Sequence, residues 1–206
     1  MPTKSPEFSM LPNPEDLELD RLCPSSDMEH MDRRIRKTRQ RLQAGLLLLM
    51  KEKPLSQITM REICRRVDVG RSTPYTHYRD VQDILEQMES VLYEELSTLL
   101  ATYPAGGSVP EKTAWFTRLY TLAQGNGLLL HVLLSFKGDP DFLQKLLTLC
   151  EERICGILSP GAQDAAWRST FLTGALVSMV RQWVSGASPE SPEDMARLTV
   201  RFLHMA

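Results

Sequence analysis

The chain has 206 residues, of which 42% are hydrophobic and 24% charged, and its net charge of −2 is ordinary for a soluble globular protein of one or two domains. Its four cysteines form no C-x-x-C pair and have no matching histidine spacing, so we expect neither a zinc ribbon nor a disulfide framework. No stretch reaches the roughly 18 apolar residues that span a bilayer, and no signal-peptide pattern opens the chain, so we expect a cytoplasmic protein without a membrane segment.

The charge is distributed very unevenly along the chain. Residues 33–79 hold thirteen basic and three acidic side chains, a net charge of +10 that leaves −12 for all other residues. Neutralisation of phosphates supplies most non-specific affinity for nucleic acids, so this asymmetry favours a nucleic-acid-binding segment joined to an acidic one. A basic helix face that is merely solvated is the alternative.

Residues 1–30 are rich in Pro, Ser, Asp and Glu and have no sustained apolar period. A segment of this composition cannot bury enough apolar surface to fold by itself. We therefore expect a flexible acidic tail before the first helix.

Two helices are expected directly after this tail. Apolar residues on one stripe predict a first helix over 33–53, which Pro54 should end because the residue before proline avoids the α conformation. Thr59 and Glu62 then have the spacing of a capping box, in which a hydroxyl and a carboxylate each satisfy a free amide at a helix start. This box predicts a second, short helix over about 60–67.

A third segment, residues 70–78, follows after a turn of three or four residues and is expected to be helical. Two short helices with such a turn make a helix-turn-helix candidate. Pro74 lies inside the third segment, so its helix should begin near Ser72 or Thr73 or be slightly distorted.

Helical patterns alone continue to the end of the chain. They predict helices at about 81–102, 111–124, 127–137, 139–157, 162–186 and 191–205. The last two have long apolar stripes that need a partner surface. The prediction is therefore an all-α fold of about nine helices.

Residues 59–85, TMREICRRVDVGRSTPYTHYRDVQDIL, resemble the N-terminal region of TetR-family regulators, and the resemblance covers about 33–100. In that family the part matching 70–78 is the recognition helix, and the aromatic pair matching His77 and Tyr78 closes it. Asp68 stands where the family commonly has glycine in the inter-helix turn. Asp adopts left-handed backbone more readily than most residues but less easily than glycine, so we expect the turn to be kept. Residues 171–183 and 191–195 are similar to the dimerisation end of the branch that includes regulators of dihydroxyacetone kinase.

The resemblance implies a flexible tail at 1–30, a helix-turn-helix DNA-binding domain at 31–79 and a helical ligand-binding and dimerisation domain at 80–206. Hydroxyl and guanidinium groups of the recognition segment can reach phosphates and base edges, and the first helix would start beside the DNA backbone. The expected DNA-binding residues are Arg33, Arg34, Arg36, Lys37, Thr59, Arg71, Ser72, Thr73, Tyr75, Thr76, His77 and Tyr78. For Tyr78 we favour packing over contact with DNA.

The resemblance also implies a small-molecule effector within the C-terminal domain, which changes the separation of two reading heads. The candidate pocket residues are Trp115, Phe116, Tyr120, His131, Phe136 and Trp167. All of these could instead fill a core. The candidate residues of a dimer interface are Phe171, Leu172, Ala175, Met179, Trp183, Leu198 and Phe202.

We therefore predict a homodimeric, sequence-specific transcriptional regulator that binds double-stranded DNA at a pseudo-palindromic operator and acts as a repressor relieved by an effector. One alternative is a protein that binds a protein partner on the same fold and has no salt-dependent DNA affinity. Another is an activator with the same DNA-binding machinery. No catalytic triad, carboxylate pair or Gly-rich phosphate loop is recognisable, so no enzyme, cofactor or metal site is predicted.

Overall fold

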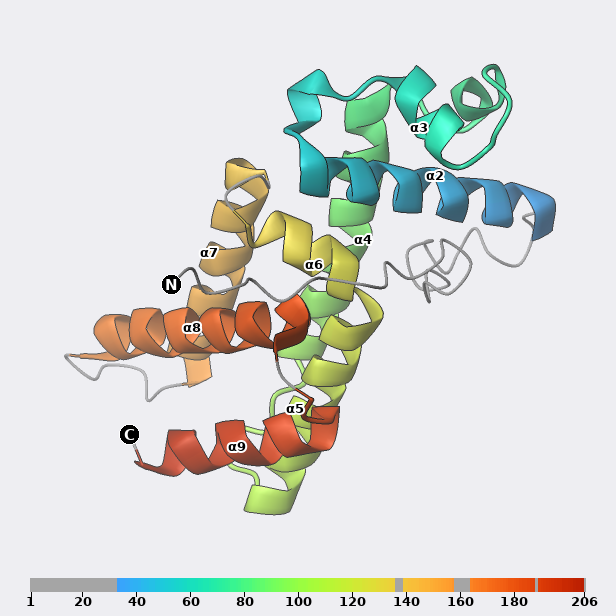
Figure 1. The fold of residues 1–206 in the computed structure, drawn as a ribbon. Helices are drawn as coiled ribbons and strands as arrows, with labels where there is room; N and C mark the ends of the chain where they lie inside the picture. Colours follow the sequence, from blue (N-terminus) through green and yellow to red (C-terminus); the bar gives the residue numbers. More distant parts are fainter. Residues whose placement is uncertain (1–32, 136–138, 158–163, 188, 206) are drawn as a thin grey trace, which may run out of the picture.

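A computed structural model describes residues 33–135, 139–157, 164–187 and 189–205. Within these ranges it contains eight α-helices and no strand, which confirms the all-α prediction (Figure 1). The expected acidic tail at residues 1–30 lies outside the described ranges. None of the described helices is both long and apolar enough to cross a membrane.

The first helices begin and end where local signals place them. Helix α2 (Arg33–Glu52) ends before Pro54, and a 3-10 turn, η2 (Leu55–Gln57), leads to α3 (Met60–Arg66). The predicted capping box is present at the start of α3. The Thr59 hydroxyl accepts a hydrogen bond from the Glu62 amide at 3.3 Å, and the Glu62 carboxylate accepts one from the Thr59 amide at 2.9 Å.

The third segment corrects the sequence prediction. Instead of a helix over 70–78, it forms one 3-10 turn, η3 (Thr73–Thr76), with Pro74 in its first positions. Proline has no amide hydrogen, and its ring is tolerated only in the first turn of a helix. A helix that starts at Pro74 would have too few residues before Tyr78 to form more than one turn. The amides of His77 and Tyr78 both donate to the Pro74 carbonyl, at 2.9 Å, and close the turn.

Close backbone contact holds α2 against α3. A Cβ atom at Gly45 would lie 2.6 Å from Cγ1 of Val67, so only glycine allows the two helices this approach. Val67 is followed by Asp68, which has a φ of 51° and supplies the left-handed residue of the inter-helix turn. The Arg41 guanidinium donates to the Val67 carbonyl at 2.6 Å and satisfies the end of α3. Together α2, α3 and η3 form what we call the N-terminal unit, residues 33–79.

Helix α4 (Val81–Leu100) runs from the N-terminal unit into the body of the molecule (Figure 1). The remaining helices are α5 (Val109–Gly125), α6 (Gly127–Leu133), α7 (Pro140–Ile157), α8 (Ala165–Gln182) and α9 (Pro192–Met205). A π-helical turn, η4 (Trp183–Ala187), extends α8. Their bounds agree with the predicted helices to within a few residues. Helix α9 packs mainly on α5, whereas α8 packs mainly on α7.

Candidate nucleic-acid interface and ligand cavity

Residues 70–78, which include η3 and which we call the recognition turn, expose a compact group of polar and aromatic side chains. Arg71, Ser72, Tyr75 and Thr76 are exposed, and 63% of the Tyr75 surface is accessible to solvent. Pro74, which lies between them in the sequence, is buried and anchors the turn in the N-terminal unit. The predicted contacts Thr73 and His77 are half-buried.

Tyr78 is buried, with 2% of its surface exposed, so the structure corrects its inclusion among the DNA contacts and supports the packing role. Its ring lies 5.4 Å from the Arg39 guanidinium, whose Nε donates to the Tyr78 hydroxyl at 3.3 Å. Arg39 also donates to the Gln87 side chain of α4 at 2.5 Å. Burial and the charge of Arg39 lower the pKa of His77, which favours the neutral imidazole.

A chain of polar contacts therefore connects the recognition turn to α4. Gln87, which accepts from Arg39, donates to the buried Asp83 carboxylate at 3.1 Å. That carboxylate also accepts from the Arg79 amide at 2.8 Å. Asp80 caps α4 by accepting from the Asp83 amide at 2.8 Å, so the segment between the turn and α4 is held at both ends. Movement of α4 would consequently move the recognition turn.

Arg39 is a positioning residue that the sequence analysis missed. It lies four residues after Ile35 and three before Leu42, on the same stripe of α2 as the apolar residues. The sequence signal that could have identified it is its place among the apolar residues on the buried face of α2.

Two groups of basic residues in the N-terminal unit differ in their surroundings. Lys53 pairs with Glu62 at 2.6 Å and Arg66 pairs with Glu52, so these cations have acidic partners within the unit. The Lys53 ammonium, with the hydroxyl and amide of Thr59, lowers the pKa of Glu62 to about 2. The second group is exposed and consists of Arg33, Arg34, Lys37, Arg61, Arg65 and Arg71, while Arg36 is half-buried. Thr59 is exposed beside Arg61, although its hydroxyl also bonds to Glu62.

A cavity of about 430 Å³ lies among α4, α5, α6, α7, α8 and α9. Its lining is mainly apolar and includes Leu92, Leu96, Trp115, Phe116, Leu146, Leu176, Val180, Val200 and Leu203. Two of the predicted pocket residues, Trp115 and Phe116, are therefore part of it.

The other predicted pocket residues lie elsewhere. Trp167 is 79% exposed on α8 and does not line the cavity, and neither does the half-buried His131. Tyr120 is a core residue whose hydroxyl lies 2.8 Å from that of Thr199, which links α5 to α9. Phe136 lies outside the described ranges.

The expected dimer contacts also divide. Phe171 and Phe202 are 66% and 47% exposed, and Ala175 is exposed as well. Leu172, Met179 and Leu198 are half-buried, and both Phe171 and Leu172 also line the cavity. Trp183 is a correction. It is buried in its own chain, where its indole donates to the Glu190 carbonyl at 2.9 Å and its ring packs edge-on against Tyr120.

Residues 110–205 match the model of a family described as a transcriptional regulator C-terminal region. Among solved structures the fold is similar to that of a TetR transcriptional regulator from Streptococcus agalactiae, with 20% identity, a TM-score of 0.52 and coverage of 83% of this chain and 96% of that one. NalD, the secondary repressor of the MexAB-OprM multidrug efflux pump in Pseudomonas aeruginosa, has 16% identity, a TM-score of 0.52 and the same coverages. DhaS, a dihydroxyacetone kinase operon activator, has 13% identity, a TM-score of 0.51 and coverage of 82% and 94%. A sequence search among curated proteins finds no match.

Proposed function

We propose that this chain is a TetR-family transcriptional regulator and that it is a sequence-specific DNA-binding repressor relieved by a small molecule. The family model that residues 110–205 match and the fold shared with a TetR regulator support this proposal. The observation that carries the proposal is the recognition turn. It exposes Arg71, Ser72, Tyr75 and Thr76 to solvent within the most basic segment of the chain. The buried residues Pro74 and Tyr78 pack this turn against the N-terminal unit.

Side-chain chemistry assigns different parts to these groups. The Arg71 guanidinium can donate two hydrogen bonds to one guanine in the major groove, and the Ser72 and Thr76 hydroxyls can position the turn on phosphates. Arg33 and Lys37, at the exposed start of α2, would add phosphate contacts that are independent of sequence. Each neutralised phosphate should contribute about −0.9 to the slope of log affinity against log salt.

The proposal includes a homodimer. Phe171, Ala175 and Phe202 give α8 and α9 exposed apolar surface, which a second copy can bury. A two-fold dimer would present two recognition turns to successive major grooves of a pseudo-palindromic site, about 34 Å apart. The reading domain would be residues 31–79, the dimerisation and ligand domain residues 80–206, and the place of action the cytoplasm, where such DNA is found.

Relief by an effector would use α4, because this helix both lines the cavity and holds the recognition turn. Leu92 and Leu96 line the cavity, and Gln87, between one and two helical turns before Leu92, bonds to Arg39. A ligand that fits better when α4 is displaced would shift the population toward a spacing that no longer fits the operator.

The experiment is a mobility-shift assay with the full chain and its own upstream DNA over a salt series. We expect tight, salt-sensitive binding that Arg71→Ala with Tyr75→Ala weakens at least tenfold and that Arg118→Ala, at an exposed arginine of α5, leaves unchanged. DNA affinity that is absent, or unaffected by the double variant, would contradict the proposal and favour a protein-binding role. A reporter fused to that DNA, with and without the gene, distinguishes repression from activation.

A further inference from the structure

The polar side chains of the cavity indicate the chemistry of its ligand. We propose that the cavity binds an elongated apolar molecule that carries one anionic group, a carboxylate or a phosphate ester. This inference rests on the proposed effector function, since it concerns the ligand of the same site.

The apolar part follows from the lining. Side chains such as Leu92, Phe116, Leu146 and Leu176 present hydrocarbon from four different helices, and the volume of about 430 Å³ is within the range of ligand pockets. A sugar or a nucleotide would leave most of its hydroxyl and amide groups without hydrogen-bond partners on such walls. An alkyl or acyl chain has no such groups.

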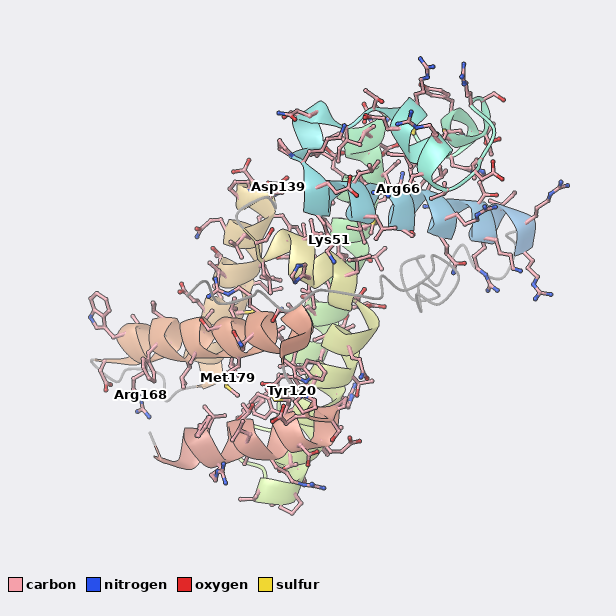
Figure 2. The ribbon with its side chains drawn as sticks, in the orientation of Figure 1. Lys51, Arg66, Tyr120, Asp139, Arg168 and Met179 are labelled. Carbon is pink, nitrogen blue, oxygen red and sulfur yellow. The ribbon has the colours of Figure 1, made fainter. Side chains whose placement is uncertain are left out.

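The charge of the polar lining is positive. Lys112 of α5 and Arg168 of α8 line the cavity, and no acidic residue does so in the part of the chain that the structure describes. No described carboxylate lies within ion-pair distance of either cation. Figure 2 shows Arg168 near the start of α8, on the side of this helix that faces α9. The cavity therefore offers an anion two cations that have no acidic partner in the described ranges.

Thr173 is a second, independent indication of a polar ligand group. It is 1% exposed and lines the cavity, and its hydroxyl has no hydrogen-bond partner among the described residues. Ser169, one turn earlier on α8, instead donates to the Glu151 carbonyl of α7 at 2.6 Å. Since buried hydroxyl groups nearly always have a partner, we infer that Thr173 bonds to the ligand.

The test is calorimetric titration of the full-length protein, without DNA, with four ligands of equal chain length below their micellar concentrations. These are dodecanoate, dodecyl phosphate, dodecanol and dodecylamine. We expect an anion to bind at least tenfold more tightly than the alcohol, and the amine to bind more weakly than both. The carboxylate and phosphate arms identify the anionic group.

Substitutions of single residues test whether the ligand binds in this cavity. Arg168→Gln and Thr173→Val should each weaken anion binding several-fold to tenfold and leave dodecanol binding unchanged, whereas Arg181→Gln, at an exposed arginine of the same helix, should have no effect. Leu176→Trp should fill the cavity and abolish binding of both ligands, with the fold checked by circular dichroism.

Equal binding of the acid and the alcohol, preference for the amine, or no effect of Arg168→Gln would overturn the inference. The same samples are assayed for operator binding. Operator binding without any binding of the anions refutes this inference alone, because the DNA-binding role would stand. Binding of the anions that depends on Arg168, without operator binding, refutes the proposed function and leaves the ligand class supported.

Discussion

Glu89 provides the sharpest quantitative test of the structure, because α4 buries its carboxyl group. Its side chain is 7% exposed, and its Oε1 atom has no hydrogen-bond partner among the described residues. Burial raises its pKa from 4.5 to about 8, and the negative charges of Asp139 and Glu86 add to this shift against the opposing effect of Lys145. We predict that Glu89→Gln, which keeps the shape and removes the charge, stabilises the protein at neutral and alkaline pH.

The direction and size of the effect follow from the two pKa values. Because the pKa is higher in the folded state, the folded protein binds more protons between about pH 4.5 and 8, and its stability falls as pH rises through that window. Glutamine does not titrate and avoids this loss. The free energy of unfolding of Glu89→Gln should exceed that of the original chain by about 1 kcal/mol at pH 5, about 3 kcal/mol at pH 7 and about 5 kcal/mol at pH 9.

The assay is urea unfolding at these three pH values and at one fixed protein concentration, since the proposed dimer would make stability depend on concentration. Glu94→Gln is the matched control, because Glu94 is exposed on the same helix and its loss should change stability by less than about 0.5 kcal/mol at each pH. A difference between Glu89→Gln and the original chain that does not grow from pH 5 to pH 9 would refute the reasoning.

Three further predictions concern packing and hydrogen bonds, all measured by urea unfolding. Gly45→Ala should lower the free energy of unfolding by about 1 to 3 kcal/mol, although alanine has the better helix propensity, because its Cβ would clash with Val67. Adding Val67→Ala should relieve much of this clash. Additive effects of the two substitutions would contradict a direct contact between these residues. Thr59→Ala should cost about 1 kcal/mol because it removes half of the capping box, and an unchanged stability would mean that the box contributes nothing. Tyr120→Phe should cost less than Thr199→Val. The Thr199 hydroxyl donates to the Met195 carbonyl at 2.8 Å, so Tyr120 is the donor in the bond between the two hydroxyls. In Thr199→Val the buried Tyr120 hydroxyl therefore loses the one partner it has among the described residues. The reverse order would contradict this assignment.

Most helix bounds were predictable because they depend on contacts within one turn of the chain. The capping box of Thr59 and Glu62, the end of α2 before Pro54 and the left-handed conformation of Asp68 are all local effects. The segregation of charge, with +10 on residues 33–79, is likewise a property of the sequence alone. Together these features were sufficient to predict an all-helical regulator.

The roles of individual aromatic and basic residues required the tertiary structure, because they depend on which face another helix covers. Tyr75 and Tyr78 are three residues apart on one turn, yet the first is exposed and the second is buried against Arg39 of α2. Trp167 and Trp183 belong to one predicted helix, yet one is in solvent and the other packs on Tyr120.

The length of η3 and the set of residues that line the cavity also depend on tertiary packing. A helix over 70–78 satisfied the periodicity of the sequence, but Pro74 and the packing of Tyr78 leave a single 3-10 turn. The cavity is lined by residues as far apart as Leu92 and Leu203, which become neighbours only when six helices pack. The sequence by itself determined where helices begin and end and where charge accumulates, since these are local properties. Only the tertiary structure decided which side chains are exposed, which line the cavity and which fill the core, because burial is set by residues distant in the chain.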